Sequence, residues 1–388
     1  MKVLVISHTY ISAINRDKWK VLAQRHPDIT LTVLFPTQWP SCLFTHDVAS
    51  ENLTDQNTHN CSFLALPVYN AGNEVRYFYK TKPLAQLLKA YKPDLIHVEQ
   101  GATALSFAQV IVLTKLLRLK TTFTFFTWIN WHIKRTWGHR IFWRFIEKLN
   151  IRNSSGAFAG NQDAEKILRE IGLTKPIKIL PQLGVDLNVF YPAQTVQEKL
   201  HFRIGFIGRL VEEKGIFLLL SAFAQCAANN VSWELIFAGK GPAYQQLIQE
   251  IKKHGLEDRI SIIDSIPHHE VADLIRTLDI LVLPSFDTPA WKEQFGHVLI
   301  EAMACKVAIL GSNAGEIPYV IGNAGLIFEQ NDLEDLTQKL MQLMQDAELR
   351  TSLALAGYQR VQQCYTHEAI ADATYNFWKQ ISPSKINS

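Results

Sequence analysis

The sequence predicts an α/β protein made of two consecutive units, each with a parallel sheet covered by helices on both faces. Its 388 residues suffice for two large domains at about 150 residues each. Short β-rich runs alternate with helical patterns in both halves, as in parallel sheets. Charge divides the chain in the same way, since residues 1–192 contain 23 Lys and Arg against 13 Asp and Glu, whereas acidic residues prevail in the remainder.

The composition excludes several other classes of protein. A hydrophobic fraction of 47% is too high for a disordered chain. Five scattered cysteines without a C-x-x-C pair exclude a disulfide scaffold or a Cys-rich zinc module and favour a reducing cytoplasm. The apolar run Val3–Ile6 is too short for a signal peptide, and no run reaches the ~20 residues that span a bilayer. We therefore expect a cytoplasmic protein, soluble or peripheral at the inner face of a membrane.

Apolar and β-branched runs give the strands of the first half, and apolar residues three and four apart give its helices. The pair Phe63–Val68 and Val75–Tyr79, around an Asn-Gly-rich turn, predicts a hairpin. The other expected strands are Lys2–Ser7, Thr30–Phe35, Asp94–Val98, Thr121–Thr127, Ala157–Gly160 and Ile177–Leu180, and the expected helices are Arg16–Arg25, Pro83–Tyr91 and Ala102–Leu119.

The alternation restarts after an irregular linker near Val185–Leu200. We expect domains at 1–192 and 193–365, with a last helix, about Glu368–Ile381 within 366–388, crossing back onto the first. Ligands of such sheets lie outside the carboxyl ends of the strands, so the cleft between the two sheets is the expected site. The expected strands are Phe202–Ile207, Trp233–Ala238, Ile260–Ile263 and Ile280–Leu283, and the expected helices are Ile216–Ala227, Tyr244–Lys253, Val298–Ala304, Leu333–Met344 and Leu349–Gln362.

Three patterns of the second half follow strands. Gly208–Gly215 contains Arg209 and Lys214 beside a helix start, which suits a diphosphate, although an exposed loop can also hold two cations by chance. Gly239-Lys-Gly-Pro242 permits close backbone approach to a ligand, but by itself it is more typical of a tight turn. No G-x-G-x-x-G or G-x-x-x-x-G-K-[ST] occurs, so dinucleotide and P-loop sites lose their main support.

The third pattern is the most specific. Glu293 and Glu301 stand eight residues apart across Gly296, where a loop becomes a helix. Because helical side chains lean towards the helix N-terminus, both carboxylates can reach one opening and bind the vicinal hydroxyls of a sugar or ribose. The alternatives are a solvated loop residue for Glu293 and a helix-dipole carboxylate for Glu301.

Together, the three patterns resemble the C-terminal domain of family 4 retaining glycosyltransferases. That family has the GT-B fold, two facing Rossmann-like domains with an interdomain cleft. Further matching stretches are Ile179–Asp186 with Phe190, Pro284-Ser285, Gly315–Pro318 and Gly325–Phe328. The resemblance is strong over about 180–365 and only architectural before it.

The resemblance implies roles for single residues. Arg209 and Lys214 correspond to the pair that neutralises the donor diphosphate, Glu293 to the contact with the donor sugar and Glu301 to the ribose ligand. It further implies retained stereochemistry and no metal or other cofactor, in keeping with the missing D-x-D motif. The remaining donor-binding candidates are Gly208, Gly239, Phe295, Gly296 and His297.

The first half departs from the family on the acceptor side. The loop after the first strand, Ser7–Ser12, has no glycine pair and contains His8. Glu99 stands where a histidine is common. Asn130 and His132 are both candidates for a second usual histidine, and the sequence does not choose between them.

Residues 128–148 combine four tryptophans with a basic run. As a helix, Trp137, Ile141, Phe145 and Leu149 form one apolar stripe beside Arg140, Arg144 and Lys148. The run either docks on an anionic membrane surface or packs its stripe on the sheet. Nucleic acid is not expected as a partner, because no known binding motif accompanies the patch.

We therefore expect a hexosyltransferase that moves a sugar from a nucleoside diphosphate to a glycan or lipid-linked acceptor. A sugar-nucleotide epimerase of the same fold and a non-catalytic nucleotide-sugar-binding protein are the alternatives. The paired glutamates argue against the epimerase.

Overall fold

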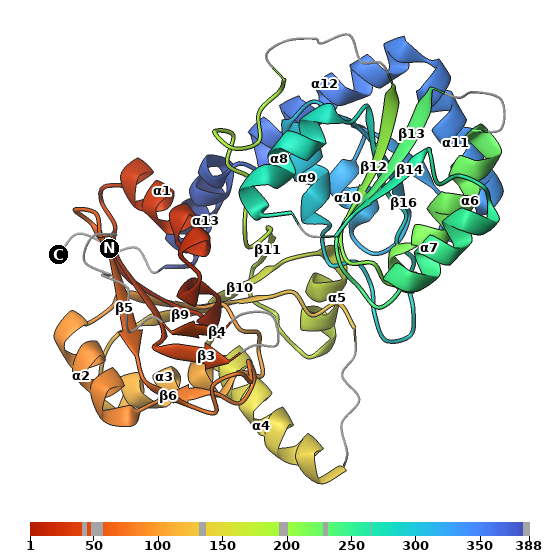
Figure 1. Ribbon diagram of the computed structural model, residues 1–388. Coiled ribbons are helices and arrows are strands. Elements are labelled where there is room, and N and C mark those ends of the chain that lie inside the picture. The colour runs from red at the N-terminus through yellow and green to blue at the C-terminus, as the bar shows by residue number, and fades with distance from the viewer. Residues whose placement is uncertain are drawn as a thin grey trace. The chain divides into compact units, whose positions relative to one another are not determined.

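The computed structural model describes residues 1–40, 45–47, 57–131, 137–193, 201–227, 232–264 and 266–382. It divides into two compact units, Met1–Gly184 with His367–Ser388 and Val185–Thr366 (Figure 1). The first change of unit falls at Gly184, ahead of the boundary expected at 192. Val185 already belongs to the second unit because its N–H donates to the Tyr365 carbonyl, at 2.8 Å.

Within the described residues, unit 1 contains a seven-stranded sheet in the order β11-β10-β9-β8-β1-β2-β5. All its strand pairs are parallel. Strands of such sheets are apolar on both faces because helices cover both. The strands are β1 (Lys2–Ile6), β2 (Thr30–Pro36), β5 (Cys61–Leu66), β8 (Leu95–Val98), β9 (Thr122–Thr127), β10 (Gly156–Ala159) and β11 (Ile177–Ile179). The helices are α1 (Asp17–Arg25), α2 (Thr81–Tyr91), α3 (Leu105–Leu116), α4 (Trp137–Asn153), α5 (Gln162–Glu170) and α13 (His367–Ile381), with the 3-10 turns η1 (His8–Ile11) and η2 (Ala13–Arg16).

The last helix, α13, completes the core of unit 1. Its Trp378 stacks on Trp19 of α1, with ring centroids 5.7 Å apart, and both side chains are almost fully buried. Phe377 packs edge-on against Phe158 of β10. The C-terminal segment is therefore a structural part of the first unit.

The expected hairpin is wrong in part. Residues 63–66 belong to β5, which pairs in parallel with β2 in the main sheet. Only β6 (Val68–Tyr69) pairs antiparallel with β7 (Phe78–Tyr79). Residues 63–66 are apolar enough for a buried strand, so they join the larger sheet, whereas Val68 belongs to the small ribbon. A second small ribbon joins β3 (Gln38–Pro40) and β4 (Thr45–Asp47).

Helix α4 buries a different face from the one that its apolar stripe suggested. Trp143 and Ile146 pack with Ala108 of α3, whereas Ile141 and Phe145 are each 63% exposed. The Asn150 amide donates to the carbonyls of Ala102 and Ala104, at 2.8 and 3.1 Å, which sets α4 antiparallel to α3. The packing of this stripe is thus contradicted for Ile141 and Phe145, whereas Leu149, in the same stripe, packs against the core of unit 1.

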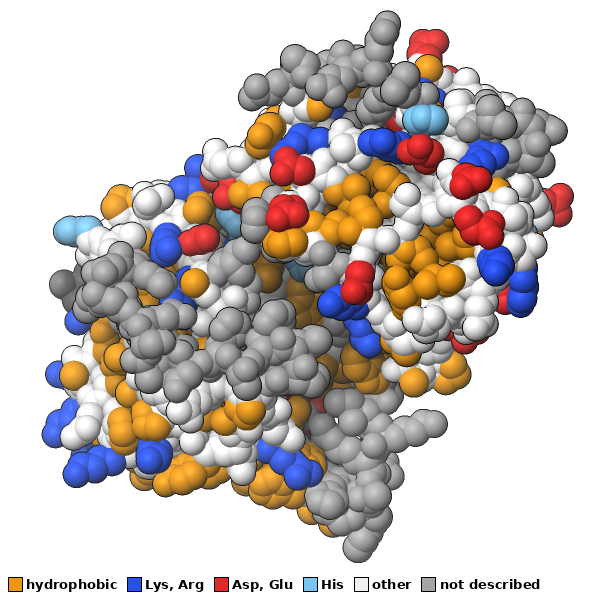
Figure 2. All heavy atoms as spheres, in the orientation of Figure 1, with side chains coloured by type: hydrophobic (Ala, Val, Ile, Leu, Met, Phe, Trp, Pro, Cys, Tyr) orange, Lys and Arg blue, Asp and Glu red, His pale blue; other side chains and the backbone are white. Residues whose placement is uncertain are grey.

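Basic side chains are frequent on the surface of unit 1. Figure 2 shows Lys and Arg side chains interleaved with hydrophobic ones over α2. Lys82 and Lys89 of α2 are exposed, as are Lys115 of α3 and Arg144 and Lys148 of α4. Several basic residues of the first half therefore lie on exposed faces of its helices.

Unit 2 contains a six-stranded sheet, in the order β14-β13-β12-β15-β16-β17 within the described residues. All pairs are again parallel. The strands are β12 (Phe202–Ile207), β13 (Trp233–Ala238), β14 (Ile260–Ile263), β15 (Ile280–Leu283), β16 (Ala308–Ser312) and β17 (Leu326–Phe328). The helices are α6 (Ile216–Ala227), α7 (Tyr244–Lys253), α8 (His268–Thr277), α9 (His297–Ala304), α10 (Ile317–Ile321), α11 (Leu333–Gln345) and α12 (Ala347–Cys364), with the 3-10 turn η5 (Glu212–Lys214).

Candidate functional site

The strand order of unit 2 places a topological switch point between β12 and β15. From β12 the chain moves outward through β13 and β14, then returns to β15 on the other side of β12. The loops after β12 and β15 diverge at such a point and leave room for a ligand at the carboxyl edge of the sheet. The cationic loop 208–215 and the loop that carries Glu293 are these two loops.

Backbone contacts hold the two loops together. The Phe286 N–H donates to the Glu213 carbonyl, at 2.9 Å. Gly215 adopts φ +70°, and a Cβ there would lie 1.9 Å from the Pro284 carbonyl oxygen, so only glycine allows this approach. Lys214, which ends η5 just before Gly215, is thereby fixed beside the loop after β15.

Lys214 and Glu293 meet at the switch point. Their side chains form an ion pair between Nζ and Oε2, with only 18% and 9% of the side chains exposed. The buried Ser285 hydroxyl donates to the same Oε2, at 3.1 Å. The Glu293 carbonyl accepts from the Glu316 N–H, at 3.1 Å, which fixes the backbone behind the carboxylate. Two residues 79 positions apart in the sequence thus form one charged centre.

The other donor-side candidates surround these loops. Arg209 is exposed in the loop after β12, and Glu301 is half-buried in the second turn of α9. Gly296 caps α9 with φ +80°. Phe295 is buried against Tyr365, so its side chain belongs to the core of unit 2. His297 opens α9, and its ring lies 4.9 Å from that of Phe295.

The glycines after β12 and β13 pack against each other. A Cβ at Gly239 would lie 2.0 Å from the Gly208 carbonyl oxygen, and the Gly208 N–H donates to the Ala238 carbonyl, at 2.9 Å. These contacts require glycine at position 239, where the chain passes close to the loop after β12.

Sequence reasoning missed Trp291. The Lys214 ammonium lies over its ring, 5.0 Å from the centroid. Trp291 stands two residues before Glu293 in an irregular loop, and a loop has no periodicity that would mark a contact across to η5. Ser285 was noted only as a match to the family, and its hydrogen bond to Glu293 requires the fold.

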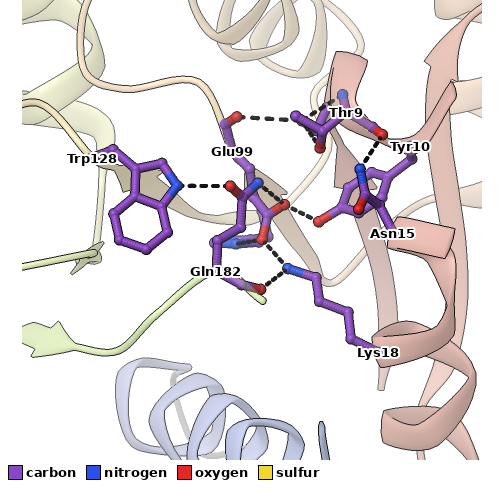
Figure 3. Close-up of polar contacts among 9 residues, drawn as sticks. Thr9, Tyr10, Asn15, Lys18, Glu99, Trp128 and Gln182 are labelled. Carbon is purple, nitrogen blue, oxygen red and sulfur yellow. Dashed lines mark hydrogen bonds and ion pairs between the residues drawn. The ribbon is translucent and has the colours of Figure 1, made fainter. Parts of the chain in front are cut away.

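Unit 1 has its own switch point, between β1 and β8, and a buried polar cluster follows these strands (Figure 3). Glu99 lies at its centre. One carboxylate oxygen accepts from Lys18 Nζ, at 2.7 Å, and the other from the Tyr10 hydroxyl and from Gln182 Nε2, the latter at 3.0 Å. Gln182 also accepts from Lys18 at its carbonyl and from the Trp128 indole at its side chain, at 2.7 and 2.8 Å.

Burial dominates the electrostatics of this cluster. Only 6% of the Lys18 side chain and 2% of the Glu99 side chain are exposed. Burial raises the pKa of the Glu99 carboxyl to about 8 and holds the pKa of Lys18 well below its ordinary value. Burial, followed by the charge of Lys18, also lowers the pKa of His97, whose Nε2 lies 3.4 Å from Glu99. Burial therefore favours the neutral acid at Glu99 and the neutral amine at Lys18.

Among the remaining acceptor-side candidates, His8 contacts the residue after Glu99, with its Nδ1 3.2 Å from Gln100 Nε2. His8 stacks on Trp39, with ring centroids 4.5 Å apart, and its Nε2 lies 3.5 Å from Glu74. The hydrogen bond from His8 lowers the pKa of Glu74. Asn130 is buried. His132 lies outside the described residues, so the choice between Asn130 and His132 stays open.

Two family models match adjacent parts of the chain. Residues 31–189 match Glycosyltransferase Family 4, and residues 191–360 match Glycosyl transferases group 1. The chain belongs to the group 1 glycosyltransferases. The first of these matches covers most of the half in which the sequence resemblance was only architectural.

Curated relatives match part of this chain. The gpi3 subunit of phosphatidylinositol N-acetylglucosaminyltransferase from Schizosaccharomyces pombe is 28% identical over 218 residues, 55% of this chain and 46% of that protein. N-acetyl-alpha-D-glucosaminyl L-malate synthase from Bacillus anthracis is 29% identical over 209 residues, 51% of this chain and 53% of that protein. The chain thus matches about half the length of each of these relatives.

Solved structures agree on the fold. The Anabaena protein Alr3699/HepE in complex with UDP and glucose superposes with a TM-score of 0.68 over 98% of this chain and all of its own, at 17% identity. Both units are Rossmann-like, and the fold class is that of the GT-B glycosyltransferases. The family models and the fold are both those of glycosyltransferases.

Proposed function

We propose that the protein is a retaining, metal-independent hexosyltransferase, which moves a sugar from a nucleoside diphosphate to a glycan or lipid-linked acceptor. The observation that carries the proposal is the Lys214–Glu293 centre at the switch point of unit 2. It joins a cation suited to phosphate and a carboxylate suited to sugar hydroxyls where an α/β sheet binds its ligand. The relatives whose names mention N-acetylglucosaminyl transfer and the UDP in the Anabaena structure support this class of donor.

Each residue has a defined part in the transfer. The bond between the anomeric carbon and the diphosphate oxygen breaks while the acceptor oxygen bonds to that carbon on the same face. Negative charge grows on the departing diphosphate, where Lys214 and the exposed Arg209 supply positive charge without a metal. The acceptor proton passes to the diphosphate. Glu293 binds sugar hydroxyls and Glu301 the ribose hydroxyls.

Turnover tests the proposal. With a panel of UDP-, GDP- and ADP-sugars and a glycan or lipid extract as acceptor, one donor class should release its nucleoside diphosphate. Release should persist in excess EDTA, because Arg209 and Lys214 stabilise the leaving group. If EDTA stops the release and Mg²⁺ or Mn²⁺ restores it, metal independence is contradicted. Release of the nucleoside diphosphate without acceptor would indicate hydrolysis of the donor.

We also propose that unit 1 meets an anionic membrane surface at the cytoplasmic face. Part of the segment 128–148 lies outside the described residues, but the described part of α4 exposes Ile141, Phe142 and Phe145 at 63%, 50% and 63%. On antiparallel α3, Val112 and Leu116 are 45% and 73% exposed. Exposed apolar side chains beside Lys115, Arg144 and Lys148 suit the boundary between headgroups and acyl chains. None of the helices in the described part of the chain has the length and apolarity needed to span a bilayer.

Sedimentation with lipid vesicles tests whether the protein binds an anionic membrane surface. The protein should sediment with vesicles that contain phosphatidylglycerol and not with pure phosphatidylcholine. Each basic residue near such a surface contributes about 1 kcal/mol, so Arg144→Glu with Lys148→Glu should release most of the protein. The double change Ile141→Ser and Phe145→Ser should also release the protein, because it removes apolar side chains that would bury themselves among the lipids. Lys253→Glu, in unit 2, should leave sedimentation unchanged. Wild-type protein that stays in solution at low salt would contradict the proposal.

A further inference from the structure

Two groups hold the ammonium of Lys214. The Glu293 carboxylate pairs with Nζ, and the Trp291 ring lies 5.0 Å from it. We propose that Trp291 is a positioning residue, which orders Lys214 for the donor diphosphate. The inference rests on the proposed function and adds to it a residue outside the matching motifs.

The loop keeps Trp291 in place through its own hydrogen bonds. The Trp291 N–H donates to the Thr288 hydroxyl, at 3.0 Å, and the Thr288 N–H donates to the Trp291 carbonyl, at 2.8 Å. The Asp287 N–H donates to the Gln330 side chain, at 2.7 Å, and Asp287 pairs with Lys292, at 3.7 Å. The turn is therefore fixed on both sides of the tryptophan.

An aromatic ring suits this task better than a second carboxylate. Lysine is a flexible side chain with three N–H donors, and ordering it costs rotamer entropy. The ring attracts the ammonium through its quadrupole without accepting a conventional hydrogen bond. Lys214 can then keep one donor on Glu293 and present another to a phosphate oxygen. A second carboxylate would instead repel the diphosphate.

Substitutions separate this role from simple packing. Phenylalanine keeps a ring with a weaker quadrupole, whereas leucine keeps only apolar volume. If Trp291 acts through the ammonium, Trp291→Phe should weaken the affinity for a nucleoside diphosphate about two- to three-fold and Trp291→Leu about ten-fold. The effect should also disappear once Lys214 is absent.

The test is calorimetric titration with UDP, GDP and ADP, using the one that wild-type protein binds. The variants are Trp291→Phe, Trp291→Leu, Lys214→Ala and the double variant Trp291→Leu/Lys214→Ala. We expect Trp291→Leu to weaken binding about ten-fold in the wild-type background and less than two-fold in the Lys214→Ala background. Tyr358→Leu is the matched control, because it removes the contact of Lys306 with a ring at 4.9 Å, elsewhere in the same unit.

The outcomes separate this inference from the proposed function. Trp291→Leu that binds like wild type, while Lys214→Ala binds weakly, would overturn the inference and leave the function intact. A ten-fold loss that persists in the Lys214→Ala background would overturn it as well, since Trp291 would then act on the loop and not on Lys214. Wild-type protein that neither binds a nucleoside diphosphate nor releases one from a donor would overturn the proposed function itself.

Discussion

Replacing Lys18 with methionine should lower the free energy of unfolding at pH 9 by about 3–5 kcal/mol, because above the pKa of Glu99 the carboxylate is then buried without its cation. Methionine fits the aliphatic path of the lysine side chain, so the loss reports charge more than volume. Urea unfolding followed by circular dichroism gives the value.

Two further variants identify the cause. Lys20→Met removes the exposed pair with Asp17 on the same helix and should cost less than about 1 kcal/mol. The double variant Lys18→Met/Glu99→Gln should recover at least half of the loss, since no uncompensated charge remains. A double variant as unstable as Lys18→Met would show that packing around Lys18, and not the ion pair, determines stability.

The loss in Lys18→Met should also depend on pH. Burial already raises the folded-state pKa of Glu99 to about 8, above its unfolded value. A group whose pKa is raised in the folded state favours folding below its unfolded pKa, and this contribution is lost as pH rises through the folded pKa. Without the Lys18 ammonium the pKa of Glu99 rises further, so the difference in stability from wild type should be small at pH 5, where Glu99 is protonated in both proteins, and larger at pH 9.

Lys214→Ala should lower kcat/KM for the donor by about 10²–10³-fold, the usual effect of removing one group that stabilises charge in the transition state. Lys214 is less exposed than Arg209, the other predicted diphosphate cation, and its ion pair with Glu293 places its ammonium at the switch point. Initial rates of nucleoside diphosphate release give kcat and KM separately.

Lys253→Ala, at the exposed end of α7, is the control for the change of net charge and should keep wild-type rates. Circular dichroism of Lys214→Ala separates a catalytic defect from unfolding. A folded Lys214→Ala variant with kcat/KM within three-fold of wild type would exclude the leaving-group role.

Much of the fold could be predicted from the sequence because buried parallel strands are short apolar runs. Four strands of unit 2, at 202–207, 233–238, 260–263 and 280–283, have the expected bounds. Strands β16 and β17 were not predicted. Strand β17 has only three residues, and a short apolar run such as β16 cannot be distinguished from a helical segment by its periodicity. Helices α5 and α8 were also missed, although the Asn161 cap of α5 and the spacing of Val271, Leu274 and Ile275 in α8 are visible signals.

The residues of the candidate site likewise include some that the sequence predicted and some that it did not. Lys214 and Glu293 were predicted because each stands in a pattern that follows a strand, and parallel strands bring such patterns to one edge. Trp291 and Ser285 act through contacts between loops, and no local pattern encodes these. The Lys18–Glu99 pair joins residues 81 positions apart, and only the folded sheet shows that Glu99 is enclosed by its partners.

Proton NMR of the reaction with the accepted nucleotide sugar, with and without acceptor, follows the transfer and its stereochemistry most directly. A retaining transferase should give the acceptor a sugar with the anomeric configuration of the donor, release one nucleoside diphosphate per transfer, and change nothing without acceptor. A new sugar nucleotide formed in the absence of acceptor would contradict the proposed transfer and identify an epimerase.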